Sequence, residues 1–151
     1  MTSKTIQDFL KQYPGPFDYC RSSDGVDATF EVYCETTDSY IIAYHFWDNR
    51  IPAELTADSV CFALNTLAAG DTRTWNAEQL PLNNQFLQAL YPGPYTTGIT
   101  ECERMPSNDV VCSRTKSVVI HEYRRGDGKE ARMVVETIAA ALNALRPNST
   151  P

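Results

Sequence analysis

Two histidines are the side chains of this sequence best suited to acid–base chemistry, because imidazole titrates close to neutral pH. His45 and His121 each lie in a β-rich run of residues. A His–Tyr or His–Asp pair in these runs, with Asp48 or Glu122 nearby, could move protons to and from a small ligand. The alternative is a partly buried histidine that a hydrogen bond satisfies. We favour this alternative, because no third group stands at a fixed spacing from either histidine.

No established catalytic or metal-binding signature accompanies the histidines. The sequence contains no G-x-S-x-G, no H-E-x-x-H and no phosphate-binding glycine loop. We therefore expect neither a cofactor nor a metal site, and a binding protein rather than an enzyme.

Five cysteines form the second group of candidate chemical residues. Cys20 and Cys34 are spaced C-x13-C and Cys102 and Cys112 are spaced C-x9-C, whereas a zinc site usually needs C-x2-C. Each pair could form a disulfide if it spans neighbouring strands. The alternative, which we favour, is that these are small buried residues. As written, with no apolar leader near residue 1, the chain is predicted to be cytoplasmic; it is exported only if the disulfides form and a leader has been removed.

Length and charge narrow the class of partner. A chain of 151 residues suits one domain, and its net charge of −6 disfavours nucleic acid as a partner. No apolar run approaches the roughly 20 residues that span a bilayer. We therefore expect a soluble, acidic protein with a protein partner, or with a small-molecule ligand as the alternative.

A repeated Tyr-Pro-Gly-Pro sequence, at residues 13–16 and 91–94, indicates how the chain is organised. At the same offset of 78 residues, "VYCETTDSYII" from Val32 aligns with "VVCSRTKSVVI" from Val110, and "ALNTL" from Ala63 aligns with "ALNAL" from Ala141. Recurring turn residues alone would explain the first match but not the other two. The sequence therefore predicts two repeats, 1–70 and 81–148, joined by a linker at 71–80 within a single domain spanning 1–151.

The predicted elements agree between the repeats. Residues 3–12 and 82–91 are predicted to be helices that stop before a proline, and each repeat is predicted to end in a helix whose apolar residues recur at i, i+4 and i+7. Strands are predicted at 26–34, 110–113 and 117–124, with a central strand at 40–47 and a further short strand after each YPGP. The predicted fold is α+β: an internal duplication of an α-β-β-(β)-α unit, packed about a pseudo-two-fold axis, with antiparallel sheet against helices.

Function is expected where the repeats differ, because residues kept in both copies serve the shared scaffold. Tyr40, Tyr44 and Phe46 stand where the second repeat has Val118, Glu122 and Arg124. Aromatic side chains rimmed by charge are typical of binding interfaces. We therefore expect a non-enzymatic binding or regulatory module that acts through protein–protein contact. The alternative is a small cofactor-free enzyme or ligand carrier with a cavity between the repeats. The candidate binding residues are Tyr40, Tyr44, His45, Phe46, Trp47, Asp48, Arg50, His121 and Tyr123.

Overall fold

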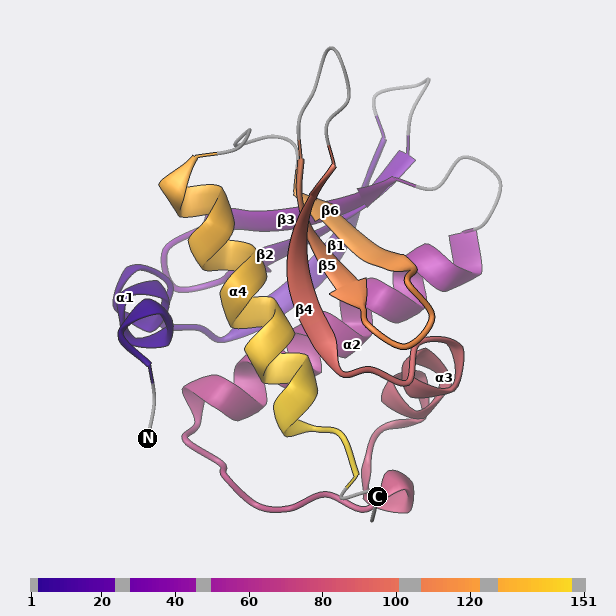
Figure 1. Ribbon diagram of the computed structural model, residues 1–151. Helices are drawn as coiled ribbons and strands as arrows, with labels where there is room; N and C mark the ends of the chain where they lie inside the picture. Colours follow the sequence, from indigo (N-terminus) through magenta and orange to yellow (C-terminus); the bar gives the residue numbers. More distant parts are fainter. Residues whose placement is uncertain (1–2, 24–27, 46–49, 101–106, 123–127, 148–151) are drawn as a thin grey trace.

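The computed structural model describes residues 3–23, 28–45, 50–100, 107–122 and 128–147, with the backbone alone at 22, 23, 28, 29, 43–45 and 50–52. Its elements are α1 (Lys4–Gln12), β1 (Phe17–Ser23), β2 (Ala28–Cys34), β3 (Ser39–His45), α2 (Arg50–Ala68), the 3-10 helix η1 (Ala77–Gln79), α3 (Leu82–Leu90), β4 (Tyr95–Thr100), β5 (Ser107–Cys112), β6 (Val118–Glu122) and α4 (Lys129–Ala144). The element order α-β-β-β-α therefore occurs twice (Figure 1).

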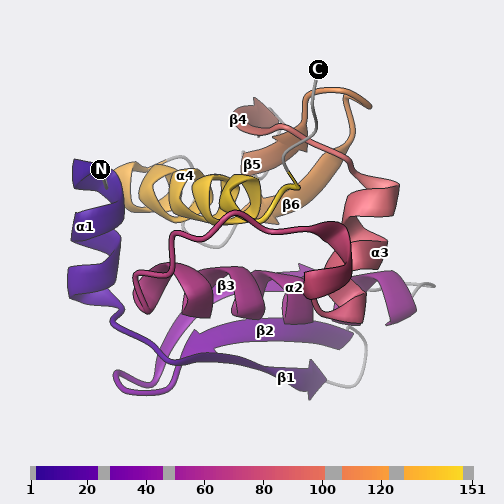
Figure 2. The same cartoon turned by 90° about the horizontal axis from the view of Figure 1, so that it is seen from below.

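The fold is α+β, with two three-stranded antiparallel sheets, β1-β2-β3 and β4-β5-β6. The long helices α2 and α4 pack against each other between the sheets, with α2 on the first sheet and α4 on the second (Figure 2). Apolar side chains from both sheets and both long helices form one core. Among the described residues, no helix is both long and apolar enough to cross a membrane.

The prediction of a central strand at 40–47 is wrong. In the first sheet β2 is the central strand, and within the described residues β3 pairs only with β2. The reason for the error is that both faces of β3 are covered, since Ile41 and Ile42 are each fully buried. Because β3 also contacts β6 of the other sheet, a strand at the edge of its hydrogen-bonded ladder has the apolar pattern of an interior strand.

Residues that are identical at the offset of 78 make the same contacts in each half of the chain. The Asn65 side chain accepts from the Phe17 amide (2.7 Å) and donates to the Phe17 carbonyl (2.9 Å). Asn143 does the same to Tyr95, at 2.7 and 2.8 Å. We call these two contacts the asparagine clamps. They hold the residue after each YPGP turn, where the Gly-Pro peptide is cis and the glycine has a positive φ, 86° in the first turn and 78° in the second.

The short first helix of each half packs on the long helix of the other half. Helix α1 contacts α4, and α3 contacts α2. In both views α1 and α3 lie at opposite ends of the paired long helices (Figures 1 and 2). Each short helix turns one apolar side chain fully inward, Phe9 in α1 and Leu87 in α3. The predicted linker 71–80 is anchored by Trp75, whose ring is buried against Phe62 with the ring centroids 5.7 Å apart.

Candidate functional sites

Helix α3 carries three large apolar side chains on the outside, although Leu87 is buried. Leu82, Phe86 and Leu90 are 62%, 50% and 55% exposed, while Asn84 of the same helix is 1% exposed. These three residues recur every four positions and so follow one face of the helix. We call them the α3 stripe. A helix of a globular protein normally buries such a stripe, so α3 has the reverse of the usual polarity.

Each amide side chain of α3 donates a hydrogen bond within the molecule. Asn83 donates to Asp58 (2.8 Å) on α2, and Gln88 donates to the Leu145 carbonyl (3.1 Å) at the end of α4. The remaining two, Asn84 and Gln85, donate to the carbonyls of Ser59 (3.2 Å) and Leu80 (2.9 Å). Hydrogen bonds thus hold α3 in place, and three of its four large apolar side chains stay in contact with solvent.

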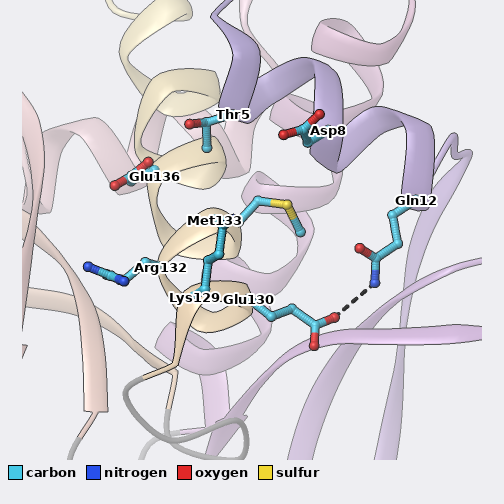
Figure 3. A pocket seen from close by; sticks show the side chains of 8 residues that line it. All are labelled: Thr5, Asp8, Gln12, Lys129, Glu130, Arg132, Met133 and Glu136. Carbon is cyan, nitrogen blue, oxygen red and sulfur yellow. Dashed lines mark hydrogen bonds between the residues drawn. The ribbon is translucent and has the colours of Figure 1, made fainter.

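Helix α1 has charged and polar residues at the positions of the α3 stripe. The offset of 78 places Lys4, Asp8 and Gln12 where α3 has Leu82, Phe86 and Leu90. Lys4 and Asp8 form an ion pair one turn apart (3.0 Å). Asp8 and Gln12 line an open groove of about 580 Å³ between α1 and α4, in which Gln12 donates to Glu130 (2.9 Å; Figure 3). The same position in the fold is therefore polar at one end of the molecule and apolar at the other.

A polar cluster lies at the end of the second sheet. Asp109 on β5 faces His121 on β6, and the carboxylate Oδ1 lies 2.8 Å from the imidazole Nδ1. Ser107 donates to the same Oδ1 (2.7 Å), and Thr100 donates to Oδ2. The Asp109 side chain is 2% exposed and that of His121 is 51% exposed. A buried carboxylate thus fixes the orientation of a half-exposed imidazole.

The geometry of this cluster decides which chemistry it can perform. Because Nδ1 of His121 faces the carboxylate, Nε2 is left as the basic atom, and it has no partner among the described residues. Ser107 approaches Nδ1 (3.2 Å) and already donates to Asp109. It is therefore not placed as the nucleophile of a Ser-His-Asp triad, in which the serine hydroxyl bonds Nε2. The cluster is suited to proton transfer or ligand binding at Nε2.

The opposite face of the same strand ends is also polar and is buried. Asn108 and Glu122 face each other across β5 and β6 and are 2% and 0% exposed. The equivalent pair in the first sheet is Phe30 and Tyr44. Burying a carboxyl group and an amide group costs stability, and such residues are frequent at functional sites.

The cysteines are free thiols in the part of the chain that the structure describes. A Cys20–Cys34 disulfide is wrong, because Cys20 faces Glu31 and Cys34 faces Phe17, and Cys20 is exposed while Cys34 is buried. Cys112 is also a free thiol, and Cys102 lies outside the described residues. The register of the first sheet therefore separates the two cysteines that the sequence spacing had suggested as partners.

Cys34 and Cys112 have the same structural role in the two halves. Their sulfur atoms each accept a backbone N–H from the glycine of a YPGP turn, Gly15 or Gly93, at 3.3 Å. Burial acts to raise the pKa of both thiols, but hydrogen bonds from the following turns, led by Thr37 and Thr115, outweigh it and lower the pKa below its ordinary value. Burial raises the pKa of the fifth, unpaired cysteine, Cys61.

The structure describes the side chains of only some of the predicted binding residues. On β3 Tyr40 is half-buried, and its neighbours Ile41 and Ile42 are fully buried, so the described part of this strand is interior. His121 is half-exposed and paired with Asp109. For Tyr44, His45 and Arg50 only the backbone is described, and Phe46, Trp47, Asp48 and Tyr123 lie outside the described residues.

The α3 stripe and Asp109 are the functional candidates that the binding prediction did not include. The same comparison of repeats, applied to the first helices instead of the third strands, would have found the stripe. A cross-strand count from the turn "CSRTKS" would have placed Asn108 opposite His121, because the register shift between Val110 and Val111 that brings Asp109 there is not visible in the sequence. Comparison with protein-family models, with curated proteins and with solved structures gave no match to this chain.

Proposed function

We propose that this protein is a non-enzymatic binding module that docks onto another protein surface through the α3 stripe. The observation that carries the proposal is the exposure of Leu82, Phe86 and Leu90 on a helix whose polar side chains are bonded inward. Covering these side chains would remove apolar area from water, worth about 25 cal/mol per Å². The proposal keeps the protein–protein function expected from the sequence and moves its surface from β3 to α3.

Site-specific photo-crosslinking tests this function. A benzophenone amino acid at position 86 should give covalent adducts with a docked protein, and the same group at position 8 of α1 should not. Leu82→Lys with Leu90→Gln, in the protein carrying the probe at 86, should abolish the adducts by making the flanks of the stripe polar. Equal labelling from positions 8 and 86 would show that α3 has no special role.

A second candidate function is proton transfer to a small ligand at His121. The observation that favours it is the buried Asp109 carboxylate 2.8 Å from Nδ1, which orients the ring and leaves Nε2 as the base. His121 does not line the groove between α1 and α4, so this groove does not support the second candidate. His45→Ala combined with His121→Ala should leave the docking function intact. Loss of function with the fold preserved would favour this second candidate instead.

We also propose that the two halves arose by internal duplication and pack about a pseudo-two-fold axis. Support comes from the pairs of equal contacts at one offset, the asparagine clamps and the Cys34 and Cys112 hydrogen bonds. An exchange of helical segments tests the equivalence. In a single exchange, residues 58–67 take the sequence of residues 136–145 or the reverse, and in the double exchange both segments are swapped. If the segments occupy equivalent places, a single exchange should destabilise the protein more than the double exchange does.

We propose a cytoplasmic location. The support is that Cys34 and Cys112 are buried free thiols whose sulfur atoms accept hydrogen bonds from the YPGP turns. A thiol count on unfolded protein checks this, and all five cysteines of the sequence should react before any reductant is added. One reactive thiol before reduction would favour an exported, disulfide-bonded protein.

A further inference from the structure

The chain around the α3 stripe has no charged residue. Residues 79–100, which include all of α3 and β4, contain no Lys, Arg, Asp or Glu, although 21% of the whole chain is charged. The equivalent residues 1–22 hold five: Lys4, Asp8, Lys11, Asp18 and Arg21. The stripe itself therefore carries no charge by which an acidic or a basic partner could be selected, and the charged side chains bonded to α3 and to the turn after it include Asp58 and Arg146, which are of opposite sign.

A charge-free apolar surface is well suited to contact with its own copy. In a two-fold dimer each residue near the axis meets the same residue of the partner, so any charge there would face a like charge. Depletion of charge is also typical of the centre of protein interfaces. From this we propose, building on the docking function above, that the occupant of the α3 stripe is the α3 stripe of a second copy of this chain.

The spacing of the stripe defines the geometry of the dimer. Side chains four residues apart form a ridge inclined to the helix axis, and two such ridges pack with a crossing angle of about −50°. The stripe has three members, so the two-fold axis passes its middle residue, and Phe86 meets Phe86 of the second copy. Leu82 and Leu90 lie on either side of the crossing. The position of α3 at one end of the helical layer leaves this crossing open to solvent (Figure 2).

Charge elsewhere on the chain determines how the dimer responds to salt. Each copy has a net charge of −6, so two copies repel at long range while the contact itself is apolar. Raising NaCl from about 0.05 to about 0.5 M screens this repulsion and should tighten the dimer. A docking that depended on opposite charges would weaken under the same change. The nine-residue helix offers less area than the roughly 800 Å² per partner of a stable interface, so the dimer should be weak and concentration-dependent.

Sedimentation velocity over a concentration series tests the dimer. The wild-type mass should rise from 16.9 kDa towards twice that value, and further at high salt. Replacing the stripe by its α1 counterparts, Leu82→Lys, Phe86→Asp and Leu90→Gln, should raise the dissociation constant more than about thirtyfold. Ile99→Arg is the matched control, because Ile99 is 60% exposed on β4 and the first half has Arg21 at the equivalent position; it should associate like the wild type. A monomeric wild type, or a triple variant that associates equally well, overturns the proposal.

A cysteine placed on the predicted axis gives a second, geometric test. In a background with Cys20→Ser and Cys102→Ser, which removes the thiol that is exposed among the described residues and the thiol that lies outside them, Phe86→Cys should form a disulfide-linked dimer under mild oxidation. A cysteine at 82 should link to itself much more slowly, because it lies about 6 Å along the helix from position 86 in each copy. Equal rates at 82 and 86 would contradict the two-fold geometry. Photo-crosslinks from position 86 to a different protein, without self-linking, would overturn the dimer and leave the docking function standing.

Discussion

Helices α1 and α3 each pack on the long helix of the other half, and their outer faces differ sharply in character. Facing inward, each buries one large apolar residue, Phe9 or Leu87, at 0% and 1% exposure. Facing outward, α1 presents an ion pair, and α3 presents leucine and phenylalanine. Packing requires only the inner face, so the outer face is free to differ. The apolar outer face of α3 is therefore not a requirement of the scaffold.

The largest expected effect tests the inner faces. Phe9→Ala and Leu87→Ala should each lower the free energy of unfolding by about 3 kcal/mol, because each leaves a cavity where a short helix meets a long one. Urea denaturation measures the loss. A small loss for one and a large loss for the other would show that the two helices do not have the same structural role.

The asparagine clamps come next. Asn65→Ala and Asn143→Ala should each cost about 2 kcal/mol, since each removes two hydrogen bonds to a strand backbone. The control is Asn83→Ala, which removes a single side-chain contact to Asp58. If the losses in free energy of unfolding of the two clamp variants differ by more than the loss in the Asn83→Ala control, the two clamps do not have the same role.

His121→Ala tests a place where the two halves carry different side chains. The offset puts Ala43 at this position in the first sheet, facing Glu31 as His121 faces Asp109. Removing the imidazole leaves Asp109 with its two hydroxyl donors, so we expect a loss of about 1 kcal/mol in urea denaturation. Thr97→Ala, at an exposed position of β4, is the control. No loss would mean that the contact between His121 and Asp109 does not stabilise the protein.

The smallest expected effect is on the outer face of α3. The triple variant Leu82→Lys, Phe86→Asp and Leu90→Gln should change the free energy of unfolding by less than about 0.5 kcal/mol, measured at low protein concentration. The lysine and the aspartate introduced at positions 82 and 86 have the spacing of the Lys4–Asp8 pair, which is favourable in a helix. A loss as large as that of Leu87→Ala would place the stripe in the core instead of on a docking surface.

Local patterns of residues predicted most of the helices and strands. Features that depend on contacts distant in sequence could not be predicted. Proline after Tyr13 and Tyr91 marked the ends of α1 and α3, and the spacing of Val60 and Leu64 marked α2. The edge position of β3 could not be predicted, because the burial of Ile41 depends on strands and helices distant in sequence. The pairing of His121 with Asp109 depends on the strand register, which the types of the neighbouring residues do not reveal.

Each short helix packs on the long helix of the other half, and this arrangement affects how the two halves stay together. Because α1 packs on α4 and α3 packs on α2, neither half completes its own packing from its own residues. A cut in the extended segment 71–74 would leave two fragments that each need the other, joined by interlocking contacts and by the core they share. The nicked protein should stay assembled, and either fragment alone should be unfolded, so the whole chain should melt as one cooperative unit.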